Sequence, residues 1–284
     1  MNRLEHIPEG LVAGDTAQLQ TKIADFIGAA ASGVHMVFDF DRTLTIRNAE
    51  TQDDITTWHI LREHLPEVAK QQYQNLYEKY RVLEIEDTMT VDDAAEWWSA
   101  ILDLFVENKL DLGLVEQDFL ARASIRPAVA ELFSLCEASN IPTIVMSAGI
   151  RDVIDIWNKT YSVNPSLVLS TALKLDDDNK ITGWYKDTLI HVLNKSEADH
   201  PELNAIRLDR PKAIIVGDSI NDADMALGDC DVLRVRILDP RPDEVVDKNS
   251  ERQKTFKRFD ALIESGSMKP LVDLIQMIIT PEHT

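Results

Sequence analysis

Short apolar runs of strand length alternate with helically spaced apolar positions along most of the chain. The runs are rich in Val, Ile and Phe, and they predict buried strands at residues 35–40, 141–146, 167–171, 213–216 and 231–237. The helical spacing predicts helices at residues 16–31, 128–138, 152 onward and 270–279. Because strands and helices that alternate in this way form βαβ units, the pattern predicts an α/β fold with a Rossmann-like parallel sheet as its core.

One long segment departs from this alternation. Residues 53–123 have helical spacing almost throughout, with one break at 84–90 and no β-rich run. We therefore expect an inserted all-helical cap. The expected boundaries are 48–126 for the cap and 1–47 and 127–284 for the core.

Further along, residues 173–184 have an Asp-rich turn between two alternating arms, which predicts a hairpin or a turn that projects from the core.

Two aspartates directly follow the first predicted strand. Asp39 and Asp41 lie at its end, and open α/β sheets bind ligands at the carboxyl edge of their strands. One carboxylate of such a pair can attack a phosphomonoester, while the other protonates the leaving alkoxide and later accepts a proton from water. The same oxygen cluster suits Mg²⁺. Taken alone, the pair has a simpler explanation, because Asp-rich turns commonly end strands without any catalytic role.

A small polar turn follows the second predicted strand. Ser147, Ala148 and Gly149 come directly after the run at 141–146 and before a predicted helix. A hydroxyl and backbone N–H groups in such a turn can hold a phosphate. The alternative is a serine that caps the helix and a glycine that permits a tight turn.

An acidic turn and a lysine complete the set of candidate residues. Asp218 follows the run at 213–216, where it can complete a magnesium site. Asp222 lies about one helical turn further on and can orient a metal-bound water or a lysine, although an acid at this place can also cap a helix. A lone lysine is usually solvated, but Lys195 can supply the positive charge that a phosphoryl group needs. Polar turns after several separate apolar runs together predict one site of phosphoryl chemistry.

The composition restricts the partners of such a site. The chain has 284 residues, of which 44% are hydrophobic and 27% are charged, and its formal net charge is -20. This acidity disfavours a nucleic acid polymer or an anionic membrane as a partner. A small anionic substrate remains compatible with it if a metal and a lysine reverse the local field.

The cysteines and the apolar runs bear on location. Cys136 and Cys230 have no CxxC spacing, so neither a disulfide framework nor a zinc site is expected. Residues 1–20 have no apolar signal sequence, and no apolar run is long enough to span a membrane. We therefore expect a cytoplasmic protein.

The order of these residues resembles that of the haloacid dehalogenase-like (HAD-like) phosphohydrolases. The matching motifs are Asp39-x-Asp41-x-Thr43, Ser147, Lys195 and Gly217-Asp218-Ser219-x-x-Asp222. The resemblance implies that Asp39 is the nucleophile and Asp41 the general acid and base. It implies Mg²⁺ as the cofactor, bound by Asp39, Asp218 and the backbone carbonyl of Asp41. It also implies that Ser147 and Lys195 bind the phosphate and that Thr43 orients the loop.

Within this superfamily the chain resembles the cytosolic pyrimidine 5′-nucleotidases, also called type III cytosolic 5′-nucleotidases. The stretches that carry this resemblance are 96–98, 147–153, 189–195 and 217–226. It implies that Glu84 reads the base and that Trp98 stacks on it. The family has a serine in this pocket where the chain has Ile101, so the base preference is left open. On the residues alone, Glu84 is a solvated charge, and Trp97 and Trp98 are packing residues, of which at most one faces the core.

These features predict a Mg²⁺-dependent 5′-nucleotidase that hydrolyses nucleoside 5′-monophosphates, pyrimidine ones preferred, through a phosphoaspartate on Asp39. An alternative with the same chemistry is a phosphatase for another small monoester, such as phosphoserine or a sugar phosphate. A non-catalytic binding protein is disfavoured because the residues of the predicted site are all present. The expected partner is a small nucleotide. Phosphoryl transfer to nucleosides, the oligomeric state and the pathway are left open.

Overall fold

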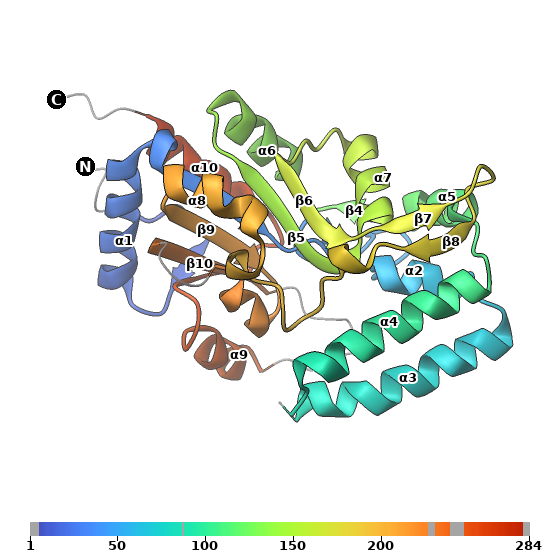
Figure 1. Ribbon diagram of the computed structural model, residues 1–284. Coiled ribbons are helices and arrows are strands. Elements are labelled where there is room, and N and C mark those ends of the chain that lie inside the picture. The colour runs from blue at the N-terminus through green and yellow to red at the C-terminus, as the bar shows by residue number, and fades with distance from the viewer. Residues whose placement is uncertain (1–5, 87, 227–230, 239–246, 281–284) are drawn as a thin grey trace.

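The computed structural model describes residues 6–86, 88–226, 231–238 and 247–280, and Cys230 lies outside these ranges. The described residues form a seven-stranded central sheet (Figure 1). Its strands are parallel to their neighbours except β1, which is antiparallel to β11. In spatial order the strands are β1 (Leu11–Ala13), β11 (Ala261–Ile263), β10 (Asp231–Ile237), β9 (Lys212–Gly217), β2 (Val34–Phe38), β5 (Thr143–Ile150) and β6 (Leu167–Thr171). The prediction of an α/β fold with a Rossmann-like parallel sheet is confirmed.

Both faces of the sheet are buried, as the apolar runs predicted. Val34, Met36 and Phe38 of β2 belong to one apolar cluster, and Val37 belongs to a second cluster on the opposite face. The second cluster is closed by Leu203 and by α8 (Asn204–Asp209). The helices next to the sheet that contribute to the first cluster are α1 (Thr16–Ala29), α6 (Val129–Ala138), α7 (Arg151–Tyr161) and α10 (Lys269–Ile279), and helices of the inserted segment also contribute to it.

The predicted strands and helices of the core are present, with shifted ends. The first predicted strand ends at Phe38, and the second continues to Ile150. The sequence analysis did not predict β1, β11 or α9 (Lys248–Thr255). The two strands have only three residues each, and Thr255 is the one buried residue of α9, so none of these elements has a readable apolar period.

The inserted segment is a helical cap. It contains α2 (Thr57–Glu63), α3 (Glu67–Ile85), α4 (Val91–Glu107) and α5 (Leu112–Arg122), and α3 and α4 run side by side at the edge of the molecule (Figure 1). The predicted break at 84–90 is confirmed, because α3 ends at Ile85 and Thr90 begins α4 in a capping box with Asp93.

A short ladder that the sequence did not predict closes the base of the cap. Strand β3 (Thr45–Ile46) pairs antiparallel with β4 (Ser124–Ile125), at the points where the chain leaves the core and returns to it. The helices of the inserted segment therefore lie between Thr57 and Arg122, and strand β4 follows them before residue 126, where the predicted cap ends. The domain boundaries next to this ladder stay a prediction.

The two adjacent tryptophans of α4 are both buried. Trp97 is 6% exposed and Trp98 is 8% exposed, so the expectation that at most one of them faces the core is wrong. The reason is that α4 packs on two sides. The ring of Trp97 stacks on Tyr80 of α3 at 5.7 Å, while that of Trp98 meets Trp58 of α2 edge-on at 6.1 Å.

The predicted hairpin is confirmed and reaches the cap. Strands β7 (Leu173–Leu175) and β8 (Ile181–Trp184) pair antiparallel. The Trp184 indole donates a hydrogen bond to Asp103 Oδ1 of α4 at 2.9 Å, and the Ile181 N–H donates to the Leu110 carbonyl at 2.9 Å. The hairpin thus joins the sheet to the cap (Figure 1).

No helix of the described chain has both the length and the apolar character that crossing a membrane requires.

Cys136 is a buried free thiol whose Sγ lies 3.5 Å from Met36 Sδ. It fills space between α6 and β2, as a small apolar residue does.

Candidate active site

The strand register brings the candidate residues to one place. Phe38 at the end of β2 is paired with Val216 of β9 on one side and with Val145 of β5 on the other. The chain passes from β2 to β5 and β6 and later returns to β9, so the strand order reverses between β2 and β9. Open α/β sheets bind ligands at such a switch point, next to the carboxyl ends of the strands.

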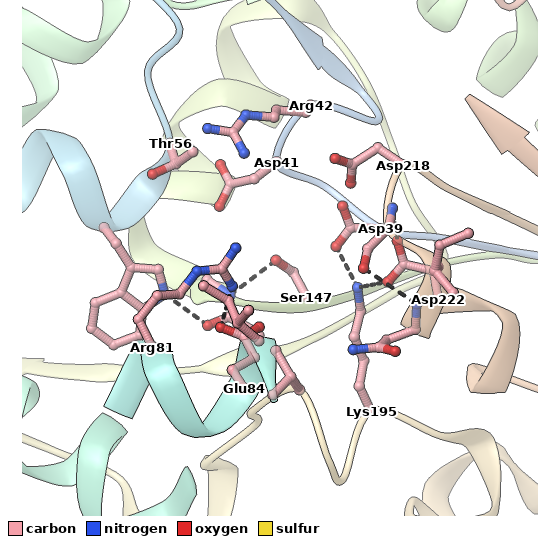
Figure 2. A pocket seen from close by; sticks show the side chains of 18 of the residues that line it. Asp39, Asp41, Arg42, Thr56, Arg81, Glu84, Ser147, Lys195, Asp218 and Asp222 are labelled. Atoms are coloured by element: carbon pink, nitrogen blue, oxygen red, sulfur yellow. Dashed lines mark hydrogen bonds and ion pairs between the residues drawn. The ribbon is translucent and has the colours of Figure 1, made fainter. Parts of the chain in front are cut away.

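Asp39 is held by three neighbours at this switch point. Its backbone N–H donates to the Val216 carbonyl at 2.9 Å, which fixes the residue directly beyond the sheet. The Thr43 hydroxyl donates to Asp39 Oδ2 at 3.1 Å, and Lys195 Nζ donates to Oδ1 at 2.5 Å. The Thr43 hydroxyl thus orients the carboxylate of Asp39. Figure 2 shows Lys195 directed at the same carboxylate.

Asp222 lies on the other side of the lysine. Lys195 Nζ donates to Asp222 Oδ1 at 2.7 Å, and the Ser219 N–H donates to Oδ2 at 2.9 Å. Asp222 thus forms a capping box with Ser219 and also accepts a hydrogen bond from Lys195, so one acid caps a helix and contacts the lysine. A Cβ at Gly217 would lie 2.3 Å from the Asp222 Cβ, so only glycine permits this close approach.

A loop with internal hydrogen bonds presents the lysine. Asn194 Oδ1 accepts a hydrogen bond from the His191 N–H at 2.7 Å, and Asn194 Nδ2 donates to the Leu189 carbonyl at 2.9 Å. His191 is buried, and burial lowers its pKa. The stretch 189–195 is therefore a preformed turn that ends at Lys195.

Carboxylates outnumber cations at the centre of the site. Oxygen atoms of Asp39, Asp218 and Asp222 lie within 4.8 Å of one another. Burial raises the pKa of Asp39 although Lys195 opposes the shift, and burial, followed by the charges of Asp39 and Asp222, raises the pKa of Asp218 well above its usual value. Burial by itself lowers the pKa of Lys195, but Asp222 and Asp39 raise it overall, so the lysine stays charged.

Asp41 is bound by a residue of the cap. The Thr57 N–H donates to Asp41 Oδ1 at 3.0 Å, and the Thr57 hydroxyl donates to Oδ2 at 2.9 Å. Burial and then the charge of Asp39 raise the pKa of Asp41 from its usual 3.8 to about 7, against the hydrogen bonds from Thr57, which lower it.

The turn at Ser147 belongs to the strand and not to a helix start. Strand β5 continues to Ile150, its register with β6 shifts between Met146 and Ile150, and α7 begins at Arg151 without a side-chain cap. The alternative that Ser147 caps the helix is therefore wrong. Ser147 is 1% exposed, and its Oγ accepts the Gly149 N–H at 3.0 Å.

Two indoles of the cap hold the carbonyl of Ala148. Trp58 Nε1 donates to it at 2.9 Å and Trp98 Nε1 at 3.0 Å. The polar edge of Trp98, the residue implied to stack on a base, is thus engaged with the turn, and its ring also lies 6.2 Å from that of His191. These two hydrogen bonds fasten the cap to the turn at residues 147–149.

A cleft of 1110 Å³ extends from the carboxylates to the cap. Glu84 lines its cap end and is not an isolated solvated charge, because it forms an ion pair with Arg81 (Figure 2). Ile101, at the position of the family's serine, also lines the cleft. Aromatic side chains that line this end are Tyr73, Tyr77, Trp97 and Trp98.

Sequence reasoning missed two residues that organise the site. Buried Arg126 donates from Nε to the Thr43 carbonyl at 2.7 Å and from Nη2 to the Thr45 carbonyl at 3.2 Å, so it holds the loop that follows Asp41. A charged residue where the chain returns from the cap was the only available signal. Thr57 had no signal, because only folding brings it to Asp41.

A parallel sheet with a helical cap, and acids, a serine and a lysine at its switch point, define the class of HAD-like phosphohydrolases. The family model of the pyrimidine 5′-nucleotidases (UMPH-1) matches residues 42–279, and the chain belongs to this family. Its members are phosphoric monoester hydrolases. The predictions of the superfamily and of the family are confirmed.

Relatives and solved structures agree with this assignment. A 7-methylguanosine phosphate-specific 5′-nucleotidase of Drosophila melanogaster is 28% identical over 227 residues, which are 75% of this chain and 70% of that protein. The crystal structure of cytosolic 5′-nucleotidase IIIB bound to cytidine matches with a TM-score of 0.79 and 25% identity over 95% of both chains. A substrate-bound phosphoserine phosphatase shares the fold, with a TM-score of 0.56 and 13% identity over 85% of this chain and 97% of that one.

Proposed function

We propose that this chain hydrolyses nucleoside 5′-monophosphates and that Asp39 accepts the phosphoryl group. The observation that carries the proposal is the setting of Asp39, whose carboxylate is oriented by Thr43 and Lys195 at the switch point of the sheet. Asp41, two residues on and hydrogen-bonded by Thr57, is proposed to be the second carboxyl group that such a reaction needs. Family membership supports the choice of substrate class.

The proposed reaction has two steps. Asp39 attacks the phosphorus, the bond to the 5′-oxygen breaks, and Asp41 gives its proton to this oxygen, so that the nucleoside leaves. Asp41 then accepts a proton from the water that attacks the phosphoaspartate, which releases inorganic phosphate and restores Asp39. Because the pKa of Asp41 is raised to about 7, both of its protonation states are populated near neutral pH, as an acid that later acts as a base requires.

Lys195 and Ser147 are proposed to bind the transferred phosphoryl group. The ammonium of Lys195 is fixed between two carboxylates and brings a positive charge to the place where the phosphoryl oxygens must lie. A preorganised charge of this kind contributes a few kcal/mol to the stabilisation of the transition state. The backbone of Ala148 and Gly149 is proposed to complete the phosphate site.

The side chains present fit Mg²⁺ as the cofactor. The oxygens of Asp39 and Asp218 lie close together, and burial, together with the neighbouring carboxylates, raises the pKa of both groups although Lys195 opposes the shift. We propose that these two carboxylates and the backbone carbonyl of Asp41 hold the ion. Asp222 is engaged with Lys195 and Ser219 and is proposed to orient the lysine. When bound, Mg²⁺ supplies further neutralisation of the phosphoryl charge.

The cap end of the cleft is the proposed base site, with Glu84 as the group that reads the base and Trp98 in its wall. A preference for pyrimidine nucleotides is supported by the description of the family and by the cytidine in the related structure. A second candidate is 7-methylguanosine monophosphate, because the Drosophila relative is named for it. Phosphoserine and sugar phosphates receive no such support, since the likeness to phosphoserine phosphatase extends to the fold alone.

Phosphate release from a panel of monophosphates, with and without a chelator, tests the proposal. The panel includes cytidine, uridine, guanosine and 7-methylguanosine 5′-monophosphates, phosphoserine and a sugar phosphate. We expect nucleotides to be the best substrates and the chelator to abolish their turnover.

Asp39→Asn should lower kcat at least about a thousandfold, since it removes the nucleophile. Asp155→Asn, an exposed acid on α7, is the matched control. Full activity of Asp39→Asn, or a preference for a non-nucleotide, would contradict the proposal.

The partner of the protein is inferred from its net charge, and its location is inferred from a related enzyme. We infer a small nucleotide as the partner and no nucleic acid polymer, because the net charge of -20 repels a phosphate backbone. A cytoplasmic location is supported by the name of the related cytosolic enzyme.

A further inference from the structure

Thr57, the first residue of α2, is the point at which the cap contacts the proposed general acid. It is fully buried, and its N–H and hydroxyl each donate to a different oxygen of Asp41, at 3.0 and 2.9 Å. Its Oγ in turn accepts a hydrogen bond from the Ile150 N–H at 3.2 Å. A threonine hydroxyl has one proton to donate and two lone pairs, so this arrangement fixes the direction of its proton toward Asp41.

These contacts exceed what the helix itself requires. The side chain that caps α2 is that of Thr56, whose hydroxyl accepts the His59 N–H at 3.2 Å. The hydroxyl of Thr57 is therefore not needed to begin the helix. The neighbouring turn also leaves room for it, because a Cβ at Gly149 would lie 2.4 Å from Thr57 Oγ. Three segments, the cap helix, the Asp41 loop and the end of β5, thus meet at one hydroxyl.

We infer that Thr57 is a positioning residue for the proton transfer by Asp41, an inference that rests on the proposed function. With both carboxyl oxygens held by one residue, the carboxyl group cannot rotate freely, and its proton stays directed at one place in the cleft. Because Thr57 belongs to the cap, the position of the base-binding helices is coupled to the orientation of the acid.

The leaving group of the substrate separates this role from a structural one. An alkoxide such as the nucleoside 5′-oxygen needs a proton as it departs, whereas the weakly basic p-nitrophenolate does not. We expect Thr57→Val, which keeps the shape and loses the hydroxyl, to lower kcat for a nucleoside 5′-monophosphate about a hundredfold, with KM changed less than about threefold. The kcat/KM for p-nitrophenyl phosphate, which reports only the steps up to departure of the leaving group and so leaves out the later role of Asp41 as a base, should fall less than about threefold. Thr57→Ser, which restores the hydroxyl, should recover most of the loss.

The controls separate failure of the inference from failure of the proposed function. Asp41→Asn should show the same dependence on the leaving group as Thr57→Val, and Thr56→Val, which removes the helix cap without touching Asp41, should show none. If Thr57→Val does not fold, as judged by circular dichroism, Thr57→Ala takes its place in the same comparison. Equal losses of kcat/KM on both substrates, or an unchanged kcat/KM for the nucleotide, would overturn the inference. If the unsubstituted protein hydrolyses no nucleotide, or if Asp41→Asn shows no such dependence, the proposed function itself fails.

Discussion

At the cap end of the cleft, Arg81 and Glu84 form an ion pair one helical turn apart on α3. A lone carboxylate at this place would favour a base with a positive charge. A paired carboxylate instead presents a donor and an acceptor side by side, which matches a neutral base with an amino group next to a carbonyl or ring nitrogen, such as cytosine. The two side chains are 40% and 20% exposed, so solvent screens the pair and its effect on binding is modest.

We predict that Arg81→Gln shifts the preference toward a nucleotide whose base is positively charged. The ratio of kcat/KM for 7-methylguanosine monophosphate to kcat/KM for cytidine monophosphate should rise about fivefold, the effect of one partly screened charge. Steady-state kinetics with both substrates measures it. Lys79→Gln on the same helix should leave the ratio unchanged, because Lys79 pairs with exposed Glu96. A ratio that stays constant in Arg81→Gln would show that this pair does not set the base preference.

Among the elements, the short ladder of β3 and β4 connects the cap to the loop that carries Asp39 and Asp41. Thr45 is paired with Ile125, and Arg126, the next residue, reaches back to the carbonyls of Thr43 and Thr45. The loop needs this support because Arg42, between the two aspartates and Thr43, has a φ of 65°, a left-handed conformation that is unfavourable for a side chain other than glycine.

We predict that Arg126→Met destabilises the protein by about 3 kcal/mol or more, because several buried carbonyls lose their donors. Urea unfolding of the purified proteins measures the free energy. Arg151→Met, which removes a half-exposed arginine on α7, should change it by less than about 0.5 kcal/mol. Equal stability of the two variants would mean that Arg126 does not support the loop.

At the scale of the whole molecule, the site reduces the stability of the fold. Asp39, Asp41 and Asp218 are buried together, and the pKa of each is raised. Over the pH range between the usual value and the raised value, the folded protein binds more protons than the unfolded chain does. The free energy of unfolding therefore falls as the pH rises through this range. The polar contacts of the site and the apolar core on both sides of the sheet must offset this cost.

We predict that Asp41→Asn becomes more stable relative to the unsubstituted protein as the pH rises from about 4 to about 7. The raised pKa of Asp41, about 7 against 3.8, sets this window, and across it the difference in the free energy of unfolding should grow by about 4 kcal/mol. Urea unfolding at a series of pH values in the presence of a chelator provides the measurement. A difference that is independent of pH, or that shrinks as the pH rises, would show that the carboxyl group of Asp41 is not strained by its burial.

Much of the fold was readable because local sequence determines it. The apolar run that ends at Asp39, the helical spacing of α1 and α10, and the turn of the β7–β8 hairpin are all patterns within one element. The motif residues Asp39, Ser147 and Asp218 could be placed in one site because parallel strands end at a common edge. Short strands such as β11 and the polar helix α9 have no such pattern, and their place depends on neighbours.

By itself, then, the sequence determined the alternation of strands and helices, the inserted cap and the chemistry at the strand ends, because periodicity and the order of motifs are local properties. Only the tertiary structure decided that Thr57 meets Asp41, that Arg126 holds the catalytic loop and that both Trp97 and Trp98 are buried. The physical reason is that these contacts join segments from different parts of the chain. Their energies depend on how the cap packs on the sheet, which no single stretch of sequence encodes.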